Sequence, residues 1–216
     1  FAIPGNPGMA QIAECHKVDI MDNDAIVKFA KENAIDLVVI GPEDPLANGL
    51  ADVLEENDIR AFGVNADAAK LEASKAYART FMAEHGLPSV KFAEFTDLKK
   101  AQDYIKSQGA PIVIKADGLA AGKGVLVAQA IDEALDFAKA CLENNKFGEA
   151  SSRIVVEECL VGEEASFLVF CDGKSYQPMV YSQDHKPIGE GDKGPNTGGM
   201  GTYSPAPILE GYEEEL

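Results

Sequence analysis

The chain has 216 residues, a formal net charge of −17 and 46% hydrophobic residues. An acidic balance of this size argues against a nucleic acid or an anionic membrane surface as partner. No apolar run reaches the length of a membrane span and no signal peptide is visible, so we expect a cytoplasmic globular protein with one large core or two smaller ones.

The sulfur and imidazole side chains do not indicate a metal site. The histidines are scattered along the chain: His16, His85 and His185. The cysteines lack the paired spacing of zinc ligands: Cys15, Cys141, Cys159 and Cys171. We interpret the cysteines as reduced thiols that fill small apolar spaces, and we predict no metal ligands among these residues.

The first third of the chain alternates strands and helices. Asp22 or Asn23 can cap a helix near residues 24–33, and a buried strand is expected at 35–40. A second helix precedes a short strand at 59–62. Strand, helix and strand at this spacing predict parallel pairing of the two strands.

Residues 41–49, with the sequence G-P-E-D-P-L-A-N-G, follow the first predicted strand. Open α/β sheets bind ligands at the carboxyl ends of parallel strands, so Glu43, Asp44 and Asn48 are candidates for a small-molecule contact. The same acids and prolines also suit the first turn of a helix. The residues themselves leave both interpretations open.

From about residue 71, helices and strands alternate again. Ser74 is expected to cap a helix at 75–85, and Lys75 lies in its first turn, where a cation opposes the helix dipole. A ligand phosphate or simple solvation would each account for Lys75. Three further elements are expected: a strand near residues 89–95, a helix that Thr96 caps and Gly109 ends, and a helix at 131–142.

The stretch 110–128, A-P-I-V-I-K-A-D-G-L-A-A-G-K-G-V-L-V-A, predicts a strand, a glycine loop and a second strand. Free N–H groups in such a loop, with lysines beside them, form a site for anions such as nucleotide phosphates. Lys115 ends the first strand, where a lysine is costly unless an anion pairs with it. The loop adds four candidates: Gly118, Gly122, Lys123 and Gly124.

Two familiar phosphate motifs do not match this loop. A Walker A loop has four residues before its Gly-Lys pair, then Ser or Thr and a helix, whereas three residues separate Gly118 from Gly122 and Gly124 follows Lys123. A dinucleotide fingerprint needs a further glycine and a helix. A glycine loop between two strands is typical of the ATP-grasp fold, and a plain β-hairpin is the alternative.

Four glutamates flank one turn within residues 153–170: Glu157, Glu158, Glu163 and Glu164. A solvated edge or a metal site would account for them. A third interpretation is adenosine binding, which requires one acceptor for the exocyclic amine and another for the ribose hydroxyls. A strand-end glutamate, a backbone N–H and a second glutamate several residues later supply that set.

Residues 182–207 predict a long binding loop. Six glycines fall between Gly189 and Gly201, and varied polar residues, including Asp184 and Lys186, surround them. A loop of this length is usually functional or disordered. Linkers rarely carry such varied polar chemistry, so a binding loop is favoured over a linker.

Six motifs spread over residues 4–207 resemble the phosphoribosylamine–glycine ligase family, ATP-grasp enzymes of de novo purine synthesis. The motifs are A-I-P-G-N-P-G, V-V-I-G-P-E-D-P-L-A-N-G-L, A-A-K-L-E-A-S-K, P-I-V-I-K-A-D-G-L-A-A-G-K-G-V, I-V-V-E-E-C-L-V-G-E-E-A-S and S-Q-D-H-K with G-P-N-T-G-G-M-G-T-Y-S-P-A-P. The last motif is highly specific for this family among ATP-grasp ligases.

The resemblance implies that ATP drives the ligation of glycine to 5-phosphoribosylamine through a glycyl phosphate, giving glycinamide ribonucleotide, ADP and phosphate. Lys115, Asp184 and Lys186 would act at the reacting groups. The implied ATP-binding residues are Lys75, Lys115, Gly118, Gly122, Lys123, Gly124, Glu157, Glu158, Leu160, Glu163 and Glu164. The implied substrate contacts are Glu43, Asp44, Asn48, Asp184, Lys186, Pro195, Asn196, Thr197, Gly198, Gly199, Met200 and Gly201.

Within this set the resemblance implies separate tasks. Lys75 and Lys115 would contact the ATP phosphates, and Glu157 would accept a hydrogen bond from the adenine amine. The backbone near Leu160 would meet the adenine ring, and Glu164, with Glu163, would hold the ribose.

The chain departs from the family pattern in three places. Val64 stands where family members usually have proline, and the G-x-G-G-R-E-H and F-N-x-R-F-G-D-P-E segments are missing. The resemblance implies that the second segment binds Mg²⁺ (or Mn²⁺), so its protein ligands are expected outside this sequence. Since the chain also starts at Phe1 without methionine, we expect a piece of a longer protein with little or no activity alone.

The expected architecture is α/β. Residues 1–70 would form a parallel-sheet (pre-ATP-grasp) domain, and residues 71–216 the first part of an ATP-grasp domain with a small mobile α+β lobe at about 95–160. The expected partners are small molecules only: glycine, 5-phosphoribosylamine and ATP. The alternatives are a non-catalytic nucleotide-binding module and an ATP-grasp ligase with a different amine acceptor.

Overall fold

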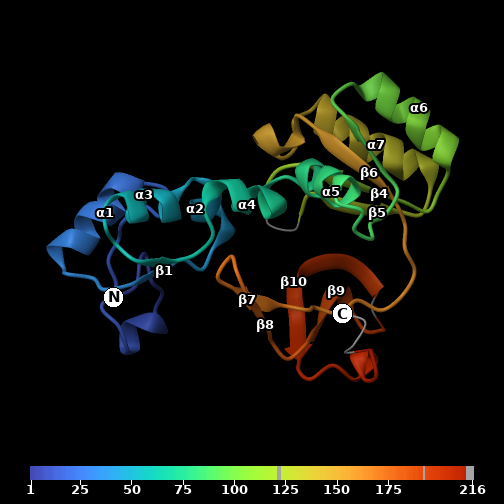
Figure 1. Ribbon diagram of the computed structural model, residues 1–216. Coiled ribbons are helices and arrows are strands. Elements are labelled where there is room, and N and C mark those ends of the chain that lie inside the picture. The colour runs from blue at the N-terminus through green and yellow to red at the C-terminus, as the bar shows by residue number, and fades with distance from the viewer. Residues whose placement is uncertain (121–122, 192, 213–216) are drawn as a thin grey trace.

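The computed structural model describes residues 1–120, 123–191 and 193–212. Figure 1 shows a smaller amino-terminal part and a larger part, which two consecutive helices join, α4 (Ala66–Ala73) and α5 (Lys75–Glu84). Parallel strands occur in the first part and antiparallel strands in the second. This mixture of helices and strands confirms the α/β class.

The amino-terminal part contains short elements around a small core. Its elements are η1 (Met9–Gln11), α1 (Asn23–Glu32), β1 (Val38–Val39), α2 (Glu43–Ala47), α3 (Leu50–Glu56) and β2 (Ala61–Phe62). Asp22 caps α1, because its side chain accepts a hydrogen bond from the N–H of Ala25 at 2.9 Å. β1 and β2 pair in parallel, with Val38 opposite Ala61. The predicted helix and the predicted parallel pairing are therefore confirmed.

Two expectations for this part are wrong in detail. The strand expected at 35–40 has only two residues and is not buried, since Val39 is 66% exposed. In the described part of the chain β1 pairs only with β2, and the paired side chains of Val39 and Phe62 are both exposed. The second helix, expected before the strand at 59–62, is divided into α2 and α3, and Gly49 between them takes a left-handed φ of 78°.

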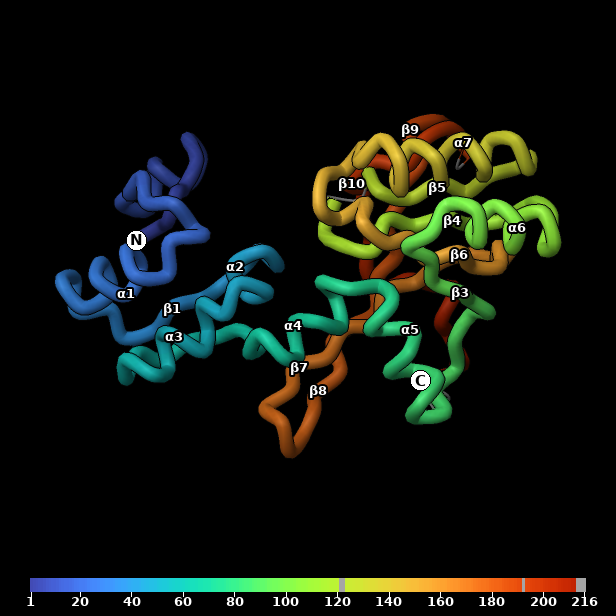
Figure 2. Tube along the Cα trace, turned by 90° about the horizontal axis from the view of Figure 1, so that it is seen from above, coloured from blue at the N-terminus to red at the C-terminus, as the bar shows by residue number. Residues whose placement is uncertain are grey.

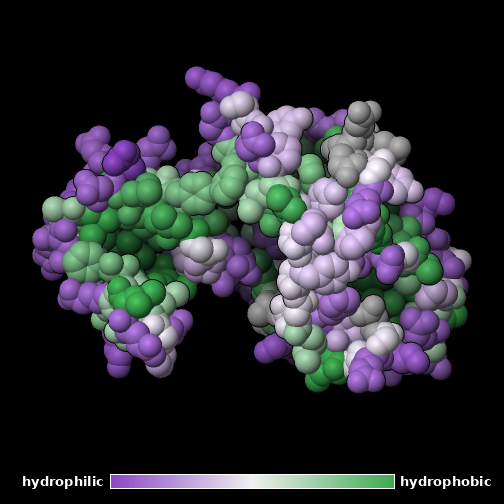
Figure 3. All heavy atoms as spheres, turned by 90° about the horizontal axis from the view of Figure 1, so that it is seen from below, coloured by the Kyte–Doolittle hydropathy of each residue, from purple (hydrophilic) through white to green (hydrophobic). Residues whose placement is uncertain are grey.

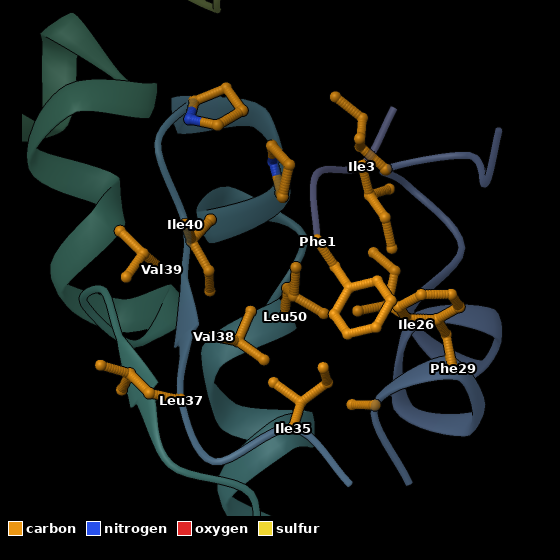
Figure 4. A pocket seen from close by; sticks show the side chains of 14 residues that line it. Phe1, Ile3, Ile26, Phe29, Ile35, Leu37, Val38, Val39, Ile40 and Leu50 are labelled. Atoms are coloured by element: carbon orange, nitrogen blue, oxygen red, sulfur yellow. The ribbon is translucent and has the colours of Figure 1, made fainter. Parts of the chain in front are cut away.

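An apolar hollow of about 170 Å³ opens beside β1. Figure 4 shows Phe1, Ile26, Phe29, Val38 and Leu50 around it. In the space-filling view of Figure 3, hydrophobic atoms spread over the amino-terminal part around this region. The core here is therefore open to solvent on one side.

The larger part is built on a four-stranded antiparallel sheet in the order β3-β6-β4-β5. Its strands are β3 (Phe92–Phe95), β6 (Ile154–Glu158), β4 (Ile112–Ala116) and β5 (Val125–Ala128). Two helices, α6 (Leu98–Gln108) and α7 (Ile131–Leu142), cover one face, and η2 (Gly148–Ser151) precedes β6. Ile105, Ile114 and Val156 are fully buried between the helices and the sheet. Burial of these apolar side chains holds the two layers together.

One helix cap differs from the prediction. The cap of α6 is Asp97, whose carboxylate accepts from the N–H of Lys100 at 2.8 Å, and not Thr96. Asp and Thr are both good caps, so the sequence pattern locates the boundary only to within one residue. Gly109 ends this helix as expected, with φ of 84°.

The carboxy-terminal segment forms two antiparallel strand pairs. Its elements are β7 (Val169–Cys171), β8 (Tyr176–Pro178), β9 (Gln183–Gly189), β10 (Lys193–Tyr203) and η3 (Pro207–Leu209). The loop expected at 182–207 is therefore wrong, because most of these residues pair as β9 and β10. The register shifts on either side of Asn196, so the glycine-rich strand bends as it pairs. None of the described helices combines the length and the apolar character needed to cross a bilayer.

Candidate functional site

The sheet face opposite α6 and α7 carries a buried ion pair. Side chains alternate along a strand, so Lys115 on β4 and Glu157 on β6 project away from the core residues Ile114 and Val156. Nζ of Lys115 lies 2.7 Å from Oε2 of Glu157. The carboxylate is 3% exposed. The expectation that Lys115 would need an anionic partner is met within the chain by Glu157.

Arg79 on α5 completes this cluster from the adjoining helix. Its Nε lies 2.7 Å from Oε1 of Glu157, and its second guanidinium nitrogen donates to Oε2 at 3.2 Å. Both oxygens of one carboxylate therefore meet a cation. Arg79 was not predicted from the sequence, although it stands four residues after Lys75 and so shares a helix face with it.

The two cations control the charge of Glu157. Burial alone would raise the pKa of the Glu157 carboxyl, but hydrogen bonds from Arg79 and Lys115 outweigh burial and lower this pKa below its ordinary value. The carboxylate is therefore ionised at neutral pH. One negative charge between two positive charges leaves the cluster with a net positive charge.

A second set of contacts joins the start of α5 to the end of β4. Ser74 caps α5 by accepting from the N–H of Tyr77 at 3.1 Å. The Asp117 carboxylate accepts from the hydroxyl of Ser74 at 3.0 Å and from the N–H of Ala76 at 2.8 Å. A carboxylate at this position also suits the helix dipole. These bonds fix the first turn of α5 against the strand that carries Lys115.

Lys75 reaches the same end of β4. Its Nζ donates to the backbone carbonyl of Gly118 at 3.1 Å and lies 3.4 Å from that of Asp117. Burial lowers the pKa of Lys75, and the charge of Asp117 opposes that change. Lys75 and Lys115 therefore lie at one end of the sheet, where an anion would find two cations.

The glycine loop after β4 is described in part. The backbone N–H of Ala116 donates to the carbonyl of Gly124 at 2.7 Å, and the backbone N–H of Lys123 donates to that of Ala120 at 2.9 Å. Gly122 lies outside the described residues. The β4–β5 hairpin confirms the predicted strand, loop and strand.

Close packing, and not a positive φ, explains two of the loop glycines. A Cβ on Gly118 would lie 2.9 Å from Cα and Cβ of Ala150, and a Cβ on Gly124 would lie 2.9 Å from Cβ of Ala120. Neither glycine takes a left-handed φ. At these two positions glycine therefore serves the close approach of neighbouring backbone and side-chain atoms.

The substitution Gly118→Ala tests this packing. We expect it to lower the free energy of unfolding by about 1–3 kcal/mol, because a backbone atom of Ala150 must shift to admit the new methyl group. Gly162→Ala is the matched control, since a Cβ there meets nothing within 4 Å. Urea unfolding of both variants measures the difference. Equal stability of the two variants would contradict the packing argument.

The residues proposed for adenosine lie on and after β6. Glu158 accepts from the backbone N–H of Lys91 at 2.8 Å, and Leu160 is 70% exposed. Glu163 and Glu164 are exposed. The Glu157 carboxylate already contacts Arg79 and Lys115, so an adenine amine would share this acceptor with both cations. The adenosine assignments stay predictions.

The residues proposed for the substrates on β9 and β10 form a separate group. Nζ of Lys186 lies 3.0 Å from Oε2 of Glu164. The backbone carbonyl of Lys186 accepts from the hydroxyl of Thr197, and that hydroxyl accepts from the N–H of Gly199 at 3.0 Å. Asp184 pairs in register with Thr202. The remaining predicted contacts lie on β10: Pro195, Asn196, Gly198, Met200 and Gly201.

The candidates of the amino-terminal part support a structural role. Glu43 and Asp44 form the exposed first turn of α2, where acids suit the helix dipole. The side chain of Asn48 donates to the carbonyl of Met21 at 3.0 Å and to Oδ1 of Asn23 at 3.2 Å. Asn48 therefore ties α2 to the start of α1. Its contact with a substrate stays a prediction.

The candidates thus fall into separate clusters. Within the described ranges, no ion pair or hydrogen bond joins the cluster of Lys75, Lys115 and Glu157 to that of Glu164 and Lys186. In the same ranges, no group of three or more His, Cys, Asp or Glu side chains could hold a metal ion. Lys75 and Lys115 could bind an anion, whereas the described residues form no metal site.

Comparison with known proteins defines the class of this fold. A family model described as the phosphoribosylglycinamide synthetase ATP-grasp (A) domain matches residues 73–215, and the model of the N domain of the same synthetase matches residues 1–72. The larger part is therefore an ATP-grasp domain. The chain belongs to the phosphoribosylglycinamide synthetase family.

Individual relatives agree with this assignment. The chain is 52% identical over 205 residues to a phosphoribosylamine–glycine ligase of Brucella melitensis, covering 95% of this chain and 48% of the relative. A crystal structure of phosphoribosylamine–glycine ligase from Thermotoga maritima is 30% identical with a TM-score of 0.78, covering 94% of this chain and 48% of the other. N5-carboxyaminoimidazole synthetase from Staphylococcus aureus, 16% identical, shares the fold with a TM-score of 0.68, covering 98% and 52%. The chain spans about half the length of the curated relatives it matches.

Proposed function

We propose that this chain contributes the ATP-phosphate site of a ligase that joins glycine to 5-phosphoribosylamine. The observation that carries the proposal is the placement of Lys75 and Lys115 at one end of the β4–β5 hairpin. The names of the relatives support this reaction, and the nearness of the two lysines supports contacts with the γ-phosphate and β-phosphate, whose charge calls for cations.

The proposed chemistry is transfer of a phosphoryl group to the glycine carboxylate, followed by attack of the ribosylamine nitrogen on the glycyl phosphate. In such a transfer, positioning and charge neutralisation dominate, and no covalent enzyme nucleophile is required. Lys75 and Lys115 would stabilise the phosphate charge. Asp184 and Lys186, with residues 195–201, would hold the other two substrates.

Mg²⁺ or Mn²⁺ would neutralise further charge on the phosphates. The described residues do not fit such an ion, since they contain no suitable acidic cluster. We therefore assign its ligands to the part of the relatives that this chain does not match, and we propose that the isolated chain binds ATP without turning it over.

A chimera tests the function. The 205 residues of the Brucella melitensis ligase that match this chain are replaced by those of the chain. We expect ADP release that requires both glycine and 5-phosphoribosylamine, and a loss of at least about a hundredfold in kcat/KM for Lys115→Met, because one phosphate ligand is removed. A coupled ADP assay provides the measurement.

Two controls accompany the chimera. Lys99→Met removes an exposed lysine on α6 and should leave the rate unchanged. The isolated chain should release no ADP. A chimera that accepts a different amine in place of 5-phosphoribosylamine would contradict the acceptor, and a fully active Lys115→Met chimera would contradict the phosphate site.

A further inference from the structure

Glu157 forms an ion pair with Lys115, the lysine that would bind a phosphate of ATP in the proposed function. Nζ of Lys115 contacts Oε2 of a carboxylate that is only 3% exposed, and Lys115 itself is 21% exposed. A lysine in this position has two competing anions, the buried carboxylate and an incoming phosphate. Movement of Lys115 toward the phosphate weakens its contact with Glu157.

The loss of Lys115 as a partner would be costly if Glu157 had no other cation. A buried ionised carboxylate without a partner is strongly destabilised. Arg79 removes that cost, because its guanidinium contacts both oxygens of Glu157, at 2.7 and 3.2 Å. The planar guanidinium suits a carboxylate in this two-point arrangement better than an ammonium group does.

The position of Arg79 keeps it in place while Lys115 moves. Arg79 lies on α5, whose first turn Ser74 and Asp117 fix to the end of β4. Its guanidinium also lies 3.6 Å from the sulfur of Met82 on the same helix. Its side chain is 22% exposed, so it is largely withdrawn from solvent. Arg79 is thus a second, fixed counter-ion for the same carboxylate.

We propose that Arg79 is a positioning residue that neutralises Glu157 and thereby frees Lys115 to bind the phosphates of the nucleotide. This inference rests on the proposed ATP site and adds a residue that touches neither nucleotide nor substrate. Arg79 acts on nucleotide affinity through Lys115. Its effect is therefore greatest on ligands that carry phosphates, while the predicted adenine contact of Glu157 depends on Arg79 less directly.

The experiment compares ATP with adenosine, using calorimetric and NMR titrations of the chain. Arg79→Met should weaken ATP binding by about tenfold or more, the usual size of coupling between two groups, and should weaken adenosine binding far less, because the carboxylate of Glu157 remains available to the adenine amine. Arg79→Lys should restore only part of the ATP affinity, since it returns a cation but not the two-point contact with the carboxylate. The double variant Arg79→Met/Glu157→Gln should also restore it, because a neutral amide no longer retains Lys115.

The outcomes separate this inference from a purely structural role. A structural role would weaken ATP and adenosine together and would not be rescued by Glu157→Gln, and either result would overturn the proposal. Unchanged ATP binding by Arg79→Met would do the same. Circular dichroism verifies folding, and Arg79→Gln carries the test if Arg79→Met does not fold. Failure of the unmodified chain to bind ATP would overturn the proposed ATP site and this inference together, whereas ATP binding that ignores Arg79 overturns the inference alone.

Discussion

Replacement of Glu157 by alanine is expected to lower the free energy of unfolding by about 3 kcal/mol. The substitution leaves Lys115 and Arg79 facing each other without the carboxylate that both contact, and breaking a buried ion pair typically costs this amount. Both cations keep some exposure, so solvent limits the loss. Urea unfolding followed by circular dichroism measures it.

The control for Glu157→Ala is the next residue on the same strand, Glu158. Glu158 is exposed and accepts one backbone hydrogen bond, so Glu158→Ala should cost no more than about 1 kcal/mol. A Glu157→Ala variant as stable as Glu158→Ala would show that the cluster contributes nothing to the fold.

The Glu157 carboxylate also makes the stability of the chain depend on pH. The pKa of Glu157 in the folded chain is lowered from the ordinary value of 4.5. The folded state therefore binds fewer protons than the unfolded state just below that pH, and the stabilisation is present above it and is lost as the pH falls through the lowered pKa. When the pH falls from neutral to below the lowered pKa of Glu157, the free energy of unfolding should decrease more in the unmodified chain than in the Glu157→Gln variant. Urea unfolding at each pH measures the difference. Parallel loss in both would contradict the assigned direction.

Ile114→Ala is expected to produce a comparable or larger loss, about 3–4 kcal/mol. Ile114 is fully buried on β4, between the sheet and the covering helices. Removal of a buried isoleucine side chain forfeits its transfer free energy and leaves a cavity. Val127→Ala, on the neighbouring strand and 43% exposed, should cost less than about 1 kcal/mol. Hydrogen exchange of the β4 amides should be accelerated more by Ile114→Ala than by Val127→Ala. A larger effect of Val127→Ala would contradict the assignment of Ile114 to the core.

Local patterns were sufficient to predict many of the elements. Asp22 and Ser74 mark helix starts that the structure retains, and the apolar runs around the glycine loop form the β4–β5 hairpin. These features depend on residues close in sequence, where capping and side-chain periodicity act. The same logic identified Lys115 as a lysine that needs an anion.

The remainder depended on contacts between distant residues. Arg79 and Glu157 are 78 positions apart, and no local pattern indicates that they meet. The glycines of residues 182–207 predicted a loop, but pairing of β9 with β10 overrides the weak strand propensity of glycine. Val39 is apolar in sequence and yet exposed, because burial depends on which layers surround a strand.

The strand order β3-β6-β4-β5 has a consequence for the emergence of the chain from the ribosome. β4 and β5 are neighbours in sequence and can pair as soon as residue 128 is available. β3 has to wait, because its partner β6 arrives about sixty residues later and inserts between β3 and β4. The Glu157 cluster forms at that same moment. During synthesis, Arg79 and Lys115 therefore lack the Glu157 carboxylate as a partner until β6 pairs with β3 and β4.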